Sequence, residues 1–95
     1  MKIIPLNSGF AYQRFSVQLG NHFLKFRLEW LTRFKYYTVD IYENDQPIVL
    51  GRALHPGVNL VAGLNTDIGI ISLEGESPTV ANLGKSNQLR WYTHE

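Results

Sequence analysis

The residue types that carry out acid–base, metal or nucleophilic chemistry are few in this sequence and lie far apart. The histidines are His22, His55 and His94, and no two of them have the spacing of metal ligands. No serine lies in a Gly-x-Ser-x-Gly context, so the sequence offers no activated nucleophile for acyl transfer. Cysteine is absent, which excludes disulfides and thiolate metal sites. The sequence therefore predicts no catalytic residue, no metal site and no bound cofactor.

The acidic residues lead to the same expectation. Glu43 and Asp45 flank one predicted turn, and Glu74 and Glu76 flank another. Two carboxyl groups act as acid and base only where burial separates their pKa values, and carboxylates at turns are usually solvated. We interpret both pairs as solvated turn residues and expect that the chain is not an enzyme.

One segment, residues 23–37, has a composition that is typical of surfaces that bind nucleic acid or protein. It interleaves basic side chains with aromatic ones, namely Lys25, Arg27, Arg33 and Lys35 with Phe23, Phe34, Tyr36 and Tyr37. Aromatic rings stack on bases while basic groups hold phosphates, as in small barrels that bind single-stranded nucleic acid. Aromatic residues and arginine are also typical of protein interfaces, and a strand pair with a basic outer face is the third interpretation. A net charge of only +1 disfavours nucleic acid and favours a protein interface.

The elements that position this segment follow from a hydrophobic period of two. Between residues 22 and 30, inward apolar side chains alternate with mostly polar ones, which is the pattern of a strand with one buried face. Residues 15–19 and 37–42 repeat this pattern. The side chains expected on the buried faces are Phe15, Val17, Leu19, Leu24, Phe26, Leu28, Trp30, Tyr37, Val39 and Ile41. Asp40 falls on an outer face, where it can pair across strands with Arg27 or Lys25.

Turn residues separate these runs from each other and from further short ones. Gly20-Asn21 and the stretch 44–47 have turn chemistry, and residues 63–67 form a predicted polar bend. Further candidate strands are 48–50, 58–61, 68–73 and 88–92. Residues 79–83 suit one short helical turn, and no long helical stripe occurs. About seven short strands with little or no helix predict an all-β single domain over residues 1–95, built as a small barrel or sandwich.

Composition agrees with a globular domain. Hydrophobic residues make up 44% of the chain and charged residues 18%. No apolar run is long enough to cross a bilayer, so we expect a soluble protein without a membrane partner.

Short motifs in a fixed order carry a resemblance that runs nearly end to end. They are Ile3–Leu6, Phe15–Leu19, Phe26–Trp30, Tyr37–Tyr42, Pro47–Ile48, Gly51, Pro56–Leu60, Leu83–Gly84 and Leu89–Tyr92. In this order and spacing the chain resembles a family of small phage baseplate plug proteins from contractile-tailed phages. Members of that family adopt an oligonucleotide-binding-like (OB-like) β-barrel. The chain departs from them at Asp45-Gln46, where members often carry Asp-Gly, and at residues 33–36, which are more basic and aromatic.

The resemblance implies a structural role in the virion. It implies a homo-oligomeric ring of three- or six-fold symmetry on the tail axis, which joins the tail tube to the hub or spike. It further implies synthesis in the host cytoplasm, and neither catalysis nor a cofactor. The alternative from the basic and aromatic segment is a free OB-like module that binds single-stranded nucleic acid.

A ring of identical subunits needs two different complementary faces on each copy. The segment 23–37 is one candidate, and Ile68–Ile71, with apolar residues on both faces of a strand, is the other. We expect the monomer to be marginally stable and assembly to stabilise it. The residues expected to make contacts between subunits are Arg27, Arg33, Phe34, Tyr36 and Ile70.

Overall fold

Seven strands make up the regular structure of the protein. The computed structural model describes residues 1–62 and 68–93, and the polar bend predicted at 63–67 and the histidine at position 94 lie outside the described residues. The strands are β1 (Lys2–Ile4), β2 (Tyr12–Leu19), β3 (His22–Leu31), β4 (Tyr36–Glu43), β5 (Gln46–Ala53), β6 (Ile70–Gly75) and β7 (Asn87–Tyr92). No helix occurs in the part of the chain that the structure describes, and hence none that could span a membrane.

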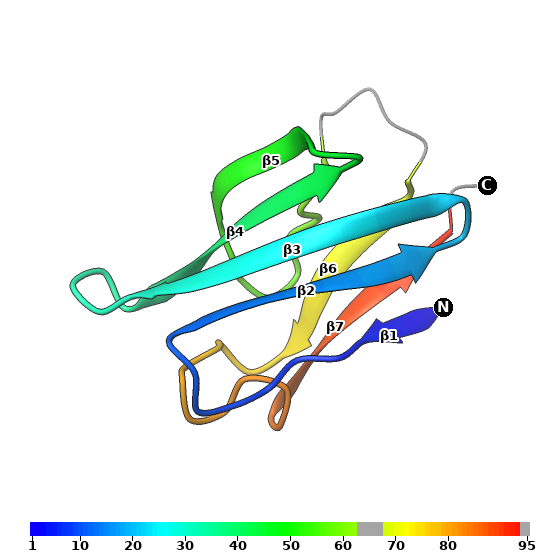
Figure 1. The fold of residues 1–95 in the computed structure, drawn as a ribbon. Coiled ribbons are helices and arrows are strands. Elements are labelled where there is room, and N and C mark those ends of the chain that lie inside the picture. The colour runs from blue at the N-terminus through cyan, green and yellow to red at the C-terminus, as the bar shows by residue number, and fades with distance from the viewer. Residues whose placement is uncertain (63–67, 94–95) are drawn as a thin grey trace.

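The strands form two antiparallel sheets that lie in two layers (Figure 1). One sheet has the order β2-β3-β4-β5, in which each strand follows its neighbour through a hairpin. The other has the order β1-β7-β6, so the first strand of the chain pairs with the last. The all-β prediction with about seven strands is confirmed. The barrel is open, because no ladder joins β1 to β2 among the described residues, and this arrangement is compatible with an OB-like fold.

The period of two sets the hydrophobic core as predicted. From the larger sheet, the inward side chains of β2, β3 and β4 are buried, and these are Val17, Leu19, Leu24, Phe26, Leu28, Tyr37, Val39 and Ile41. Phe15 and Trp30 are also expected on the buried faces but are only half-buried at the margin of the core, where Phe15 stacks on Phe26 with ring centroids 5.3 Å apart. The smaller sheet contributes Ile4, Ile71, Leu73, Leu89 and Trp91. The Trp91 Nε1 donates to the Ile68 carbonyl oxygen at 2.7 Å, so the indole is buried without an unsatisfied donor.

Two tight turns fix the register of the larger sheet. Gly20 has φ 61° at the first position of the two-residue loop between β2 and β3, as a type II′ turn requires. Asn44 and Asp45 both have positive φ, 52° and 64°, which is the type I′ pattern. Pro47 lies inside β5 and does not precede it, and a proline is tolerated there because β5 is an edge strand of its sheet.

Two strand predictions differ from the structure. Residues 58–61 do not form a strand, because Gly57 at φ 79° and the hydrogen bond from the Val61 N–H to the Asn59 side chain bend the backbone. This segment and the residues before it form only isolated bridges to β6. The seventh strand is instead β1, whose three residues are too few to show a period. At 79–83 the predicted turn is present as a single bond, in which the Leu83 N–H donates to the Thr79 carbonyl at 3.0 Å.

The two sheets meet along two seams. At the first, which we call the closed seam, residues 54–60 leave β5 and run beside β6. The Gly57 N–H donates to the Leu73 carbonyl at 2.9 Å, and the Leu60 N–H donates to the Ile71 carbonyl at 2.7 Å. Asn59 Oδ1 accepts from the Ile71 N–H at 3.0 Å. The second, the open seam, is the gap between β1 and β2.

Candidate assembly surfaces

The loop between β3 and β4 gathers aromatic and basic side chains at one end of the molecule. We call Arg33, Phe34 and Tyr36 the hairpin tip, and the hairpin that carries them projects at the left of Figure 1. The Leu31 carbonyl accepts from the Lys35 N–H at 2.7 Å and from the Phe34 N–H at 3.1 Å, which closes the loop. The sequence thus folds here into a tight loop with its side chains outward.

The side chains of the hairpin tip lie in contact with one another. The rings of Phe34 and Tyr36 are 6.2 Å apart, and the Arg33 guanidinium lies 5.9 Å from the centre of the Phe34 ring. His55, in the segment that follows β5, packs against Tyr36 with ring centroids 5.6 Å apart. Phe34 is 63% exposed although it is fully apolar. A side chain of this kind at a projecting loop is a suitable anchor for a protein partner.

A second cluster, the basic face, lies on the outer surface of β2 and β3 and consists of Arg14, Lys25 and Arg27. In the register Arg14 lies directly opposite Arg27, and like charges in that position repel each other. Together with Tyr12, Tyr42 and the acidic Asp45, the three cations line a shallow hollow of about 360 Å³. The sequence segment 23–37 included Lys25 and Arg27, but Arg14 was not among the predicted contact residues.

Tyrosines hold the Arg27 guanidinium in place. Its Nε donates to the Tyr12 hydroxyl at 3.2 Å, and the same group lies 5.8 Å from the centre of the Tyr12 ring. Hydrogen bonding to Tyr12, and after it to Tyr42, raises the pKa of Arg27 above its ordinary value. The two tyrosines therefore fix the Arg27 guanidinium on the basic face.

Asp40 binds a backbone group of β5 and forms no ion pair with the basic face in the described part of the chain. It lies opposite Arg27 in the register, as the sequence allows, but its Oδ1 accepts from the Gly51 N–H at 2.6 Å. Gly51 has φ 66° at an irregularity in the β4–β5 register, so the carboxylate stabilises a bulge. Among the described residues, no ion pair joins Arg14, Lys25 or Arg27 to a carboxylate.

The outer face of the smaller sheet has the opposite character. Arg90 Nη1 lies 3.3 Å from Glu74 Oε1 and its Nη2 donates to Gln88 at 2.8 Å. The Tyr92 hydroxyl donates to the other Glu74 oxygen at 2.5 Å. These polar groups satisfy one another and offer little to a charged partner. Ile70, the predicted contact residue of this sheet, is 46% exposed beside them, while Ile68 and Ile71 are buried.

The predicted contact residues therefore occupy three separate places. Arg33, Phe34 and Tyr36 form the hairpin tip, Arg27 belongs to the basic face, and Ile70 lies on the other sheet. Arg14 was the residue that sequence reasoning missed. The signal was available, because the two-residue turn at Gly20-Asn21 pairs Leu19 with His22 and so places Arg14 against Arg27.

The histidines and acids form no metal-binding cluster in the part of the chain that the structure describes. No group of three metal-ligating side chains occurs among these residues. His22 Nδ1 lies 2.6 Å from Glu43 Oε2, which links the start of β3 to the end of β4.

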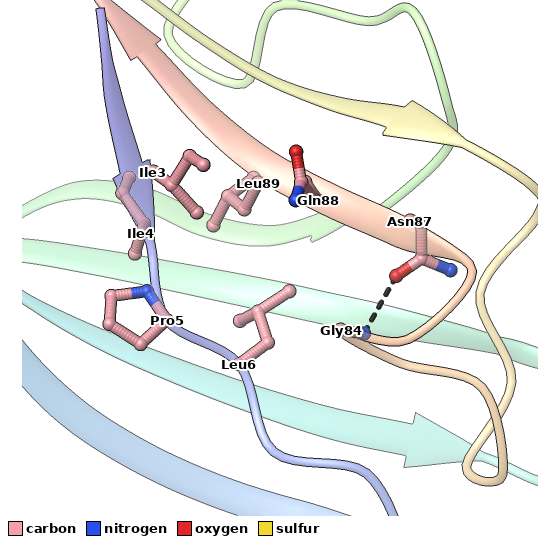
Figure 2. Close-up of a pocket in the computed structure, with 8 residues that line it drawn as sticks. All are labelled: Ile3, Ile4, Pro5, Leu6, Gly84, Asn87, Gln88 and Leu89. Atoms are coloured by element: carbon pink, nitrogen blue, oxygen red, sulfur yellow. Dashed lines mark hydrogen bonds between the residues drawn. The ribbon is translucent and has the colours of Figure 1, made fainter.

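A small pocket of about 140 Å³ lies beside β1, and its lining shows how the N-terminal strand is attached (Figure 2). The Gly84 N–H donates to Oδ1 of the buried Asn87 at 2.8 Å. Gly84 has φ 81°, and a Cβ there would lie 2.7 Å from the Leu6 carbonyl oxygen. This close approach requires glycine at position 84. The residues around the pocket therefore attach the N-terminal segment to the loop before β7.

Comparison with known proteins adds one finding. A family model described as the cyanophage baseplate Pam3 plug gp18 matches residues 1–94. No curated protein matches the chain.

Proposed function

The chain belongs to the family of cyanophage baseplate plug proteins, and on that premise we propose that it is a structural protein of the phage tail baseplate. In this role it forms a ring of three- or six-fold symmetry on the tail axis and joins the tail tube to the hub or spike. It is made in the host cytoplasm and acts in the virion by shape and interface burial, without catalysis.

One observation supports a role in assembly above the others. The basic face sets Arg14 against Arg27 with no described carboxylate within ion-pair distance, whereas the outer face of the smaller sheet satisfies its own charge. The isolated chain bears the cost of this repulsion, and acidic groups on a neighbour relieve it. The hairpin tip adds an exposed aromatic anchor at the end of the same sheet.

Exposed apolar side chains on several sides are consistent with more than one neighbour. Those that are at least 42% exposed are Met1, Ile3, Phe10, Tyr12, Phe23, Phe34, Leu50, Val58 and Ile70. Single exposed apolar residues are normal, but a subunit within a ring needs two different faces. We propose the hairpin tip with the basic face as one of them and the surface around Ile70 as the other.

Electron cryomicroscopy of the parent virion tests this proposal directly. We expect several copies around the tail axis within the baseplate, with the hairpin tip and the basic face against neighbouring chains. Density for this chain only at another place in the virion would contradict the proposal.

A pair of matched substitutions tests the hairpin tip in solution. Phe34 and Leu50 are almost equally exposed, at 63% and 62%, but only Phe34 belongs to the proposed interface. We expect Phe34→Ala to weaken assembly by about tenfold, as hot-spot aromatics do, and Leu50→Ala to leave it unchanged. Analytical ultracentrifugation over a range of concentrations measures both, and equal effects would contradict the assignment of the hairpin tip.

The alternative function is binding of single-stranded nucleic acid, and the tyrosines beside the basic face favour it. A fluorescently labelled oligonucleotide, titrated at two salt concentrations, separates the two functions. We expect no binding at micromolar protein. Micromolar affinity that falls steeply with added salt would support the nucleic-acid function.

A further inference from the structure

The open seam leaves one edge of each sheet without a strand partner. Strands β1 and β2 run past each other in opposite directions (Figure 1). At one end Lys2 Nζ donates to the Gln18 carbonyl at 2.7 Å. At the other end the Gln13 side-chain amide donates to the Asn7 carbonyl at 2.9 Å and accepts from the Asn7 N–H at 3.2 Å. Side chains, and not a backbone ladder, therefore bridge the seam at its two ends.

Between these bridges, the backbone of β2 presents unused hydrogen-bonding groups. The Ala11 carbonyl accepts from the Trp30 N–H at 2.6 Å, so it faces β3, whereas the Gln18 carbonyl faces β1. Because backbone groups alternate along a strand, the N–H and C=O of Arg14 and Ser16 also face the seam. Among the described residues, β2 pairs with β3 alone, so these groups have no strand partner. Edges of this kind accept an additional strand.

A groove of about 350 Å³ runs along this edge, and its lining alternates in character. Phe15 and Val17 face inward and provide apolar contacts, whereas the exposed Ile3 lines the outer side of the groove from β1. Arg14 and Ser16 face outward. A strand laid against β2 would place every second side chain over the apolar lining and the others beside Arg14.

Charge determines which strand fits. Lys2 and Arg14 line the groove, and none of the nine described residues that line it is acidic. Lys25 joins Arg14, Phe15 and Ser16 around an adjoining hollow of about 240 Å³. An incoming strand with acidic outward side chains would lie beside Arg14 and Lys25, which form no ion pair among the described residues, although Asp45 lines the neighbouring hollow.

We propose that the open seam binds an extended segment of another protein, in which apolar residues alternate with acidic ones, as an added strand on the edge of β2. The segment hydrogen-bonds to the backbone of Arg14 and Ser16, and its acidic side chains lie beside Arg14 and Lys25. The proposal rests on the proposed function only for the source of the segment, which is another baseplate protein.

A synthetic strand tests the proposal on the intact chain. The probe is a capped peptide of about seven residues in which valine alternates with glutamate, a length typical of strands. The control peptide carries lysine in place of glutamate. We expect the glutamate peptide to shift and protect the Arg14 and Ser16 amides in ¹⁵N nuclear magnetic resonance spectra, and the lysine peptide to bind at least about tenfold more weakly. Equal binding of both peptides, or shifts confined to other strands, would overturn the proposal.

Two further measurements separate backbone pairing from simple attraction of charge. Ser16→Pro removes a backbone N–H that faces the seam, and it leaves every hydrogen bond of the β2–β3 ladder in place, so it should abolish peptide binding. Ser16→Ala keeps this N–H and should not change peptide binding. If the proline variant does not fold, a glutamate peptide methylated at alternate backbone nitrogens gives the same information with the natural chain. Undiminished binding of that peptide would overturn strand addition.

Two remaining outcomes of these experiments would overturn the proposed binding of a segment from another protein without contradicting the proposed baseplate function. Protection of the Arg14 and Ser16 amides that increases with protein concentration, without peptide, would show that a second copy occupies the seam and would overturn the proposed partner. Absence of peptide binding, together with virion density on the tail axis, would overturn this inference and leave the baseplate role intact.

Discussion

The closed seam and the open seam join the same two sheets, but they use bonds of different kinds. At the closed seam, backbone groups of residues 54–60 bond to backbone groups of β6, and Leu54 and Leu60 are fully buried beside them. At the open seam, the cross-seam bonds come from the side chains of the exposed Lys2 and the half-buried Gln13. Exposed side-chain bonds can be exchanged for bonds to water or to a partner at little cost, whereas buried backbone bonds cannot. The closed seam therefore holds the fold, and the open seam is available for binding.

Loss of a buried side chain at the closed seam should have the largest effect. Leu60 is completely buried, so Leu60→Ala removes apolar contacts and leaves a cavity. We expect a loss of about 2–5 kcal/mol in the free energy of unfolding. Urea denaturation followed by circular dichroism measures it, with Leu50→Ala, at 62% exposure, as the control. A loss below about 1 kcal/mol would show that the closed seam contributes less than we infer.

Loss of a polar bridge at the closed seam should have a smaller effect. Asn59 Oδ1 accepts from the N–H groups of Val61 and Ile71, at 3.2 and 3.0 Å. Asn59→Ala leaves both donors without this acceptor and should cost about 1–3 kcal/mol. Thermal unfolding provides the measurement, because about 1 kcal/mol lowers the melting temperature of a domain of this size by roughly 4–8 °C.

A matched asparagine at the open seam gives the control for that experiment. Asn7 is exposed and bonds to Gln13 through its backbone only. Asn7→Ala should therefore change stability by no more than about 0.5 kcal/mol. Similar losses for the Asn59 and Asn7 variants would remove the contrast between the seams.

Loss of the side-chain bridges at the open seam should cost less again. Lys2→Ala and Gln13→Ala each remove exposed hydrogen bonds, and each should cost no more than about 1 kcal/mol. Hydrogen exchange should nevertheless become faster at the amides of residues 2–4, because β1 retains only its ladder to β7. Unchanged exchange in both variants would show that the bridges do not hold the seam.

The smallest expected effect has the opposite sign. Arg14→Gln removes one of two like charges that lie opposite each other, so it should stabilise the isolated chain by about 0.2–1 kcal/mol at low salt. The gain should disappear at high ionic strength, because salt screens charges at the surface. Chemical denaturation at two salt concentrations measures the difference. A loss of stability at low salt would mean that Arg14 has a favourable partner in the monomer.

Features that depend on near neighbours in the sequence were predictable. Alternation identified the buried faces of β3 and β4, and Gly20-Asn21 identified the turn that fixes the β2–β3 register. The hairpin tip was predictable for the same reason, since Arg33, Phe34 and Tyr36 lie within one loop and at its end.

Features that depend on pairing across long distances were not predictable from local patterns. Strand β1 has three residues and is defined by its partner β7, at the other end of the chain. Asp40 could be placed opposite Arg27, but its bond to Gly51 depends on a bulge in β5 that no local pattern indicated. The open seam likewise depends on which edge strands of the two sheets lie side by side, and the sequence of neither strand indicates this.

The pairing of β1 with β7 also sets an order for folding during synthesis. The four strands of the larger sheet follow one another through hairpins, and all of them precede residue 54, so that sheet can form on the ribosome while the chain is still growing. Strand β1 is synthesised before the other strands of this domain, but Lys2 can pair with Trp91 only after β7 has been synthesised. A chain interrupted before residue 87 would lack β7, so β1 would have no strand partner and the apolar side chains of the larger sheet would lose the cover of Leu89 and Trp91.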